Sequence, residues 1–155
     1  MRTTIDVELL RKELEHVTAH PDEWDQSRWI VRTSCGTTGC LAGGTALRAG
    51  YVPYEVTDVI GQLTWVYVDH DDPVRNDDSW EDWIQVPDLR VLSVQTVARR
   101  LLGLTNIQAM DLFAPHNTLE DLWIIASELT DGAIEVPPSV IEAAREPHRD
   151  GDDVR

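Results

Sequence analysis

The first part of the chain carries apolar residues at helical spacing. They recur at intervals of three, four and three residues, at Val7, Leu10, Leu14 and Val17, which places them on one stripe of a helix. Pro21 ends this pattern, because the residue before a proline avoids helical backbone angles. The pattern predicts an amphipathic helix over residues 5–19.

A second helix is expected after a bend rich in glycine and threonine. A short strand near 29–33 is followed by residues 35–40, which we interpret as a turn, and by small residues that continue to Gly50. Gly43 and Gly44 fall inside this helix, where each costs roughly 1 kcal/mol relative to alanine. We therefore predict a buried helix over about 38–49, with another element close against its glycine face.

The middle of the chain alternates between strand-like and acidic segments. The β-branched and aromatic residues 63–68 predict a strand, and residues 83–86 could form a second strand that pairs with it before Pro87. Between them, residues 69–82 hold seven carboxylates and a single arginine, Arg75. This composition is typical of an exposed connection.

Cap residues and apolar spacing predict four helices in the C-terminal half. They are a helix capped by Ser93 and ended by Gly103, one opened by a Thr105/Gln108 capping box with Ile107, Met110, Leu112 and Phe113 as its apolar residues, one opened by Thr118 and Asp121 and ended by Gly132, and one from Pro137–Ser139 to about 145. The sum is an α+β fold that is predominantly α-helical, with five to six helices and a small two- or three-stranded sheet. We expect one globular domain over residues 1–145 and a charged, flexible tail over 146–155.

Charge narrows the possible functions. The 155 residues include 28 acidic and 13 basic side chains, for a net charge of −15. This balance argues against direct nucleic-acid binding and against docking on an anionic membrane, both of which require basic groups. No run approaches the ~18 apolar residues of a membrane span. With only two cysteines and no apolar leader, we expect a cytoplasmic protein with reduced thiols.

The cysteines and two histidines supply one candidate metal site. His16 and His20 share a helical face at i and i+4, and with Cys35 and Cys40 they complete the four nitrogen and sulfur ligands that zinc prefers. The spacing differs from that of common zinc motifs. Two buried cysteines and two surface histidines are the favoured alternative, so no cofactor is expected and zinc stays a second hypothesis.

Cys40 is also a candidate nucleophile. It lies near the N-terminus of the predicted helix, where free N–H groups stabilise a thiolate. A cysteine hydrolase would bring a histidine from elsewhere, and His70 or His116, the latter beside Asn117, could act as the base. The alternative is that the bend only starts a tightly packed helix.

Residues 96–105 and the following helix have features of a helix-turn-helix. The second helix offers Asn106, Gln108 and Asp111 but no lysine or arginine, so docking in a major groove would be weak. We interpret the segment as a core αα-hairpin.

The acidic stretch is the candidate partner-binding surface. Calcium binding is disfavoured because the segment lacks the glycine and spacing of an EF-hand loop. Aromatic side chains beside carboxylates suit protein interaction, although both tryptophans could instead cover the sheet. The candidate residues are Asp69, Asp71, Asp72, Asp77, Asp78, Trp80, Glu81, Asp82 and Trp83.

One motif carries a family resemblance. The segments His20-Pro21-Asp22-Glu23-Trp24-Asp25-Gln26, Trp29 and Cys35-Gly36-Thr37-Thr38-Gly39-Cys40-Leu41-Ala42-Gly43 resemble a pattern, HP-x-x-W/F-x-Q…W…CGT-x-x-C-x-AG, found in small actinobacterial and actinophage proteins. The resemblance extends over about residues 5–130. It implies a cytoplasmic product of a bacterium or its phage, and it implies no catalytic or binding role.

These observations favour a non-enzymatic interaction protein that engages a basic partner, such as the nucleic-acid-binding face of a host protein. Clustered carboxylates can stand in for phosphate charge and steer association. The cysteine hydrolase and the zinc-stabilised domain are the alternatives, and a homodimer kept in solution by its charge is also compatible with the sequence.

Overall fold

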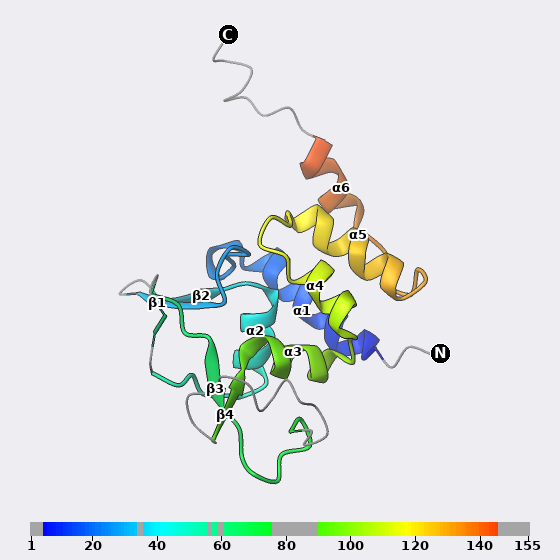
Figure 1. Cartoon of the computed structure of the whole chain (residues 1–155). Helices are drawn as coiled ribbons and strands as arrows, with labels where there is room; N and C mark the ends of the chain where they lie inside the picture. Colours follow the sequence, from blue (N-terminus) through cyan, green and yellow to red (C-terminus); the bar gives the residue numbers. More distant parts are fainter. Residues whose placement is uncertain (1–4, 34–35, 56, 59–60, 76–89, 146–155) are drawn as a thin grey trace.

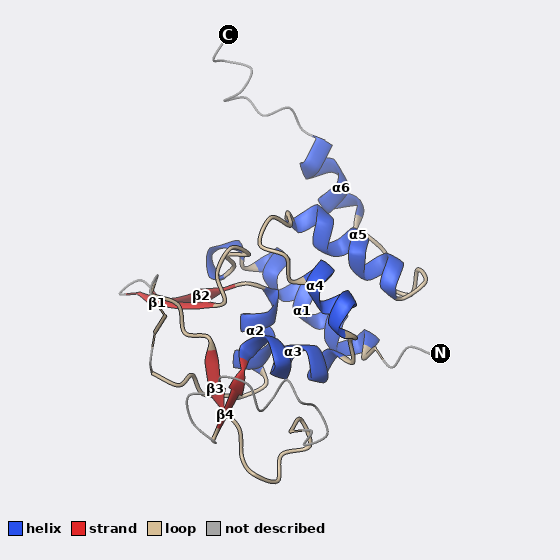
Figure 2. Cartoon of the chain, viewed as in Figure 1, coloured by secondary structure: helices blue, strands red, loops and turns tan. Residues whose placement is uncertain are grey.

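The computed structural model describes residues 5–33, 36–55, 57–58, 61–75 and 90–145. These residues form six α-helices and two separate two-stranded antiparallel sheets (Figures 1 and 2). The prediction of a mostly helical α+β fold is confirmed, with two small sheets in place of one. The expected tail, residues 146–155, lies outside the described residues.

Helices dominate the chain order, and the strands lie between the first helix and the third. From the N-terminus, the elements are α1 (Val7–Ala19), the 3-10 turn η1 (Pro21–Glu23), β1 (Ile30–Thr33), β2 (Gly36–Gly39), α2 (Leu41–Arg48), β3 (Trp65–Tyr67), β4 (Val91–Ser93), α3 (Val94–Leu102), α4 (Asn106–Leu112), α5 (Leu119–Leu129) and α6 (Pro138–Arg145).

The caps predicted at Ser93, Gly103, Thr105 and Thr118 are confirmed. The end predicted at Gly132 is not, because α5 ends at Leu129 with Thr130 as its C-cap. The Ser93 side chain accepts a hydrogen bond from Thr96 N at the start of α3, and Gly103 ends that helix with a φ of 74°. Both capping boxes are complete, at Thr105 for α4 and at Thr118 for α5. Each box satisfies backbone donors that the helix itself leaves free, which fixes where the helix begins.

The bend before α2 is the main correction to the predicted elements. Residues 36–39 form a strand rather than a turn, paired with β1 from Ile30↔Gly39 to Thr33↔Gly36. The helix therefore begins at Leu41 instead of 38, with Cys40 as its N-cap. The β-branched Thr37 and Thr38 suit a strand once β1 supplies a partner.

The second sheet contains a strand that the sequence patterns did not predict, β4. β3 pairs with β4, with Trp65 opposite Ser93 and Tyr67 opposite Val91. The segment 83–86, expected to be the partner of this strand, lies outside the described residues.

Helix α2 lies in the middle of the fold, between α1, α3 and the β1–β2 hairpin, while α5 and α6 pack together on the far side of α1 (Figure 1). Its first six residues, Leu41 to Ala46, are all buried. Leu41, Ala42 and Ala46 belong to one hydrophobic core that also contains Leu10 of α1, Leu102 of α3 and Trp123 of α5. The prediction of a buried central helix is confirmed.

Candidate functional site

The residues of the sequence motif converge on one side chain, that of Gln26. Its Oε1 accepts hydrogen bonds from Trp24 Nε1 at 3.0 Å and from Leu41 N at 3.1 Å. Its Nε2 donates to the carbonyls of Leu112, at 3.2 Å, and Ala114, at 3.1 Å. Gln26 is 6% exposed and uses both ends of its amide. It therefore links the start of α2 to the end of α4, which is a structural role for this part of the motif.

The glycines of the motif allow a close approach of backbone to backbone. A Cβ on Gly43 would lie 1.9 Å from the carbonyl oxygen of Trp29, and one on Gly39 would lie 2.4 Å from the same atom. The expected close contact on the glycine face is confirmed at Gly43, with the residue preceding β1 as the neighbour. At Gly44 the nearest group is instead the guanidinium of Arg48.

Cys40 is buried, with 2% of its surface exposed. Its Sγ accepts a hydrogen bond from Gly43 N at 3.4 Å, the N-cap contact of α2. Burial raises the pKa of the thiol to about 11, although the backbone hydrogen bonds at the helix start act to lower it. The shift runs opposite to the thiolate stabilisation expected of an activated nucleophile.

The side chains proposed to act with Cys40 as catalytic residues have other surroundings or other hydrogen bonds. Within the described chain, the Cys40 side chain bonds to the backbone of Gly43 and Trp29 rather than to an imidazole. His70 and His116 are exposed, and Asn117 is buried with its Nδ2 donating to the carbonyls at the end of α4. An adjoining cavity, lined in part by Cys40 and Gln62, has a volume of about 110 Å³, well below that of sites for small molecules.

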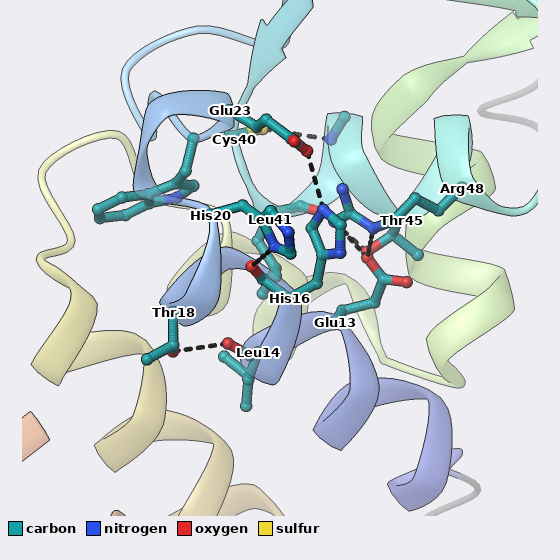
Figure 3. A network of polar contacts seen from close by, with 12 residues as sticks. Glu13, Leu14, His16, Thr18, His20, Glu23, Cys40, Leu41, Thr45 and Arg48 are labelled. Atoms are coloured by element: carbon teal, nitrogen blue, oxygen red, sulfur yellow. Dashed lines mark hydrogen bonds and ion pairs between the residues drawn. The ribbon is translucent and has the colours of Figure 1, made fainter. Parts of the chain in front are cut away.

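His16 and His20 share a face of α1, as predicted. Their rings stack with centroids 4.3 Å apart, His16 Nε2 lies 2.9 Å from Glu23 Oε1, and His20 Nδ1 lies 3.0 Å from the carbonyl of His16 (Figure 3). Cys35 lies outside the described residues. Among the residues that are described, no three histidine, cysteine or carboxylate side chains form a group that could hold a metal ion.

A buried ion pair joins α1 to α2 beside these histidines. The Glu13 side chain is 6% exposed and its Oε1 accepts a hydrogen bond from Arg48 Nε at 2.7 Å (Figure 3). Glu13 lies at the edge of the apolar stripe, three residues after Leu10 and four before Val17, which the sequence-based prediction did not use. Its burial follows from the packing of α1 against α2.

The aspartates in the described part of the acidic stretch differ in exposure and in hydrogen bonding. Asp69 and Asp71 are exposed, whereas the Asp72 carboxylate accepts hydrogen bonds from Tyr51 Oη at 2.9 Å and Val74 N at 2.8 Å. Burial, the hydrogen bond to Asp72 and the negative charges of Asp72 and Asp69 raise the pKa of Tyr51 to about 12. The remaining candidates, Asp77, Asp78, Trp80, Glu81, Asp82 and Trp83, lie outside the described residues.

A pocket of about 360 Å³ adjoins the exposed aspartates. Its described lining includes His70, Arg75 and Arg90 as well as Asp69. The guanidinium of Arg90 lies 5.6 Å from the centre of the Tyr67 ring, and Arg75 donates to the carbonyl of Val68. This side of the predicted acidic surface is therefore mixed in charge.

The sequence patterns did not predict an exposed apolar surface on α4. The apolar spacing places Ile107 and Met110 among the residues that hold this helix in the core, but they are 75% and 66% exposed. The inward side of the helix is formed by Ala109 and Leu112. Ile107 and Met110 lie three residues apart, so they share one outward face.

The charged side chains of the region that follows α3 are almost all acidic. Residues 101–144 contain no lysine or arginine, and they contain seven carboxylates: Asp111, Glu120, Asp121, Glu128, Asp131, Glu135 and Glu142. Five of these are exposed, Glu120 and Asp121 being half-buried. This signal is present in the sequence, and it becomes a surface property because α5 packs against both α4 and α6 (Figure 1).

Comparison with known proteins found no matching family model, no matching curated protein and no matching solved structure. None of the helices in the described part of the chain is both long and apolar enough to cross a lipid bilayer.

Proposed function

We propose that this protein is a non-enzymatic binding protein whose acidic exterior engages a basic partner protein, for example at that partner's nucleic-acid-binding face. The observation that carries the proposal is the helical half formed by α4, α5 and α6. It presents five exposed carboxylates, and residues 101–144 themselves include no lysine or arginine. Arg11 of α1 reaches this half, where its Nη2 donates to the carbonyl of Ala133.

A surface whose charged groups are mainly carboxylates favours an interaction with basic partners. Carboxylates of like charge raise the local negative potential, which speeds the encounter with a positively charged surface and discourages negatively charged ones. Phosphate groups attract the same basic residues. A surface of this kind can therefore compete with nucleic acid for a basic face.

The position of Cys40 counts against the cysteine hydrolase alternative. The thiol is buried, its pKa is raised to about 11, and its hydrogen-bond partners are backbone groups of Gly43 and Trp29. A nucleophilic cysteine needs a thiolate that its substrate can reach. The zinc alternative depends on Cys35, and elemental analysis of the purified protein decides it.

The experiment compares two variants with the same change in net charge. Glu135→Gln/Glu142→Gln removes two exposed charges from the helical half formed by α4, α5 and α6. Glu15→Gln/Asp22→Asn removes two exposed charges from α1 and η1. Immobilised parent protein is expected to retain basic proteins from a bacterial lysate, identified by mass spectrometry. Their retention should fall steeply as salt is raised from low to moderate concentration.

The first variant should lower this retention more than the second. Equal losses for the two variants would mean that only the total charge matters, and the proposed location would be wrong. If the parent retains no basic protein in a salt-dependent manner, the proposed function itself is contradicted.

A further inference from the structure

We propose, on the basis of the function proposed above, that the outward face of α4 is the apolar anchor of the binding surface. We infer that it takes a cationic amphipathic helix of a partner protein, in which apolar side chains are flanked by lysine or arginine. The face consists of Asn106, Ile107, Met110 and Asp111, which are all exposed.

The two apolar side chains of this face are more exposed than the other large apolar side chains of the described chain. Ile107 is 75% exposed and Met110 is 66% exposed, the two highest values among the exposed large apolar side chains of the described chain. Their spacing of three residues lets one partner side chain contact both. Methionine is adaptable and recurs on surfaces that receive apolar helices.

The fold does not need these side chains in order to hold α4. The inward residues Ala109 and Leu112 are fully buried. The capping box of Thr105 and Gln108 fixes the start of the helix, and Asn117 and Gln26 bind carbonyls at its end. The outward face is thus presented on a helix whose position is set by other contacts.

Charge complementarity selects the kind of partner. Asp111 lies on the same face, α5 packs against α4, and α5 and the α6 helix beyond it carry exposed carboxylates without lysine or arginine before Arg145. The arginines that precede α4, Arg99 and Arg100, are half-buried on α3. A cationic helix gains attraction at the rim of the apolar pair, whereas a second copy of this chain brings a further charge of −15 and is repelled.

The test uses a synthetic amphipathic helix of leucine and lysine as the probe, with its affinity measured by isothermal titration calorimetry. A second peptide has the same composition with the lysines redistributed so that the apolar stripe is lost. The parent protein should bind the amphipathic peptide at least about tenfold more tightly than the redistributed one, because only the first can bury its apolar stripe on α4.

Matched variants locate the site. Ile107→Ser/Met110→Gln should weaken binding of the amphipathic peptide by about tenfold or more, since it removes both apolar contacts. Val52→Ser is the control, because Val52 is also exposed, at 58%, but lies outside α4. It should change the affinity by less than about twofold. Circular dichroism should show that both proteins keep the helicity and thermal transition of the parent.

The outcomes separate this inference from the proposed function. If Ile107→Ser/Met110→Gln binds the peptide as the parent does, while binding still weakens with salt, the α4 inference is wrong and the acidic binding function stands. If neither peptide binds in a salt-dependent way, both are contradicted. A dimer of the parent that the double variant loses in analytical ultracentrifugation assigns the face to a second copy, and duplex DNA binding lost in the same variant assigns it to nucleic acid; either result overturns the inference.

Discussion

The carbonyl oxygen of Trp29 occupies the place where a side chain on Gly43 would begin. A Cβ built on Gly43 would lie 1.9 Å from that oxygen. The contact brings the residue before β1 onto the face of α2, and Cys40 N donates to the carbonyl of Arg28 at 2.7 Å beside it. The glycine of the motif at position 43 is therefore explained by one backbone contact.

We expect Gly43→Ala to destabilise the protein strongly. The new methyl group meets backbone, which cannot rotate away, so the hairpin must separate from α2. The free energy of unfolding should fall by roughly 3 kcal/mol, the upper part of the range for overpacked cores. Urea denaturation followed by circular dichroism measures the change.

Gly44→Ala is the control for this substitution. It introduces the same methyl group one residue later, where the neighbour is the end of the Arg48 side chain. The guanidinium is the end of a long side chain and can move, which weakens its ion pair with Glu13, while alanine favours the helix by about 1 kcal/mol. We expect Gly44→Ala to cost less than Gly43→Ala, and equal costs would contradict the role given to the Trp29 carbonyl.

Replacement of Gln26 should be costly even though it is not near a charged group. Gln26→Leu keeps a similar volume but leaves Leu41 N and the Trp24 indole without the acceptor they use. The carbonyls of Leu112 and Ala114 each lose one donor and keep a bond from Asn117. Each buried group left unsatisfied costs about 1–3 kcal/mol. Gln26→Leu should lower the free energy of unfolding by roughly 3 kcal/mol or more, measured in urea.

Gln62→Leu provides a comparison, because Gln62 is also buried but its Oε1 accepts a single backbone hydrogen bond, from Trp29 N, while its Nε2 bonds to the Asp58 side chain. We expect a smaller loss than for Gln26→Leu. If the order is reversed, Gln26 is not the central link between α2 and α4.

Local patterns predicted the helices well because their signals lie within a few residues. The capping boxes at Thr105 and Thr118 each depend on a side chain three residues later, and Gly103 ends α3 in a conformation that suits glycine. Such contacts form wherever the segment is helical. They were therefore readable before any tertiary contact was known.

The features that escaped prediction depend on distant partners. Residues 36–39 look like a turn until β1 pairs with them, and Gln26 bonds to Leu112 across 86 positions of sequence. Ile107 and Met110 have the spacing of core residues, and only the placement of α4 turns them outward. The cation-free stretch of 101–144 was readable from composition, but its meaning as a surface needed the packing of α4 to α6.

The ion pair between Glu13 and Arg48 should be much more costly to break than to replace. Arg48→Met removes one partner and leaves a carboxylate that is 6% exposed without its cation. We expect a loss of about 3 kcal/mol, because a buried charge without a partner keeps its desolvation cost. The double variant Glu13→Leu/Arg48→Met should recover most of that loss.

A double-mutant cycle in urea measures this coupling. The exposed pair Arg32–Glu55, whose Nη1 and Oε2 atoms are 2.7 Å apart, is the control. Its side chains are 47% and 61% exposed, so its coupling should stay below about 1 kcal/mol. Equal coupling energies for the two pairs would contradict the importance of burial at Glu13.

Cys40 should make the stability of the protein depend on alkaline pH. The pKa of the thiol is about 11 in the folded chain, against 9.0 for the unperturbed group, because burial disfavours the thiolate. The unfolded state therefore loses its proton first. The stabilisation is complete below pH 9 and declines as the pH rises towards 11, by at most roughly 3 kcal/mol.

The measurement compares urea denaturation of the parent and of Cys40→Ser between pH 8 and about pH 11. Serine keeps an acceptor for Gly43 N but does not ionise in this range. Tyr51, with its pKa raised to about 12, is common to both proteins and cancels in the difference. The parent should lose stability relative to Cys40→Ser as the pH rises. Cys40, distinguished from Cys35 by peptide mapping, should react with iodoacetamide at pH 8 only at the rate of unfolding. A thiol that is alkylated rapidly in the folded protein would show that Cys40 is open to solvent, and the packing role given to the motif would then fail.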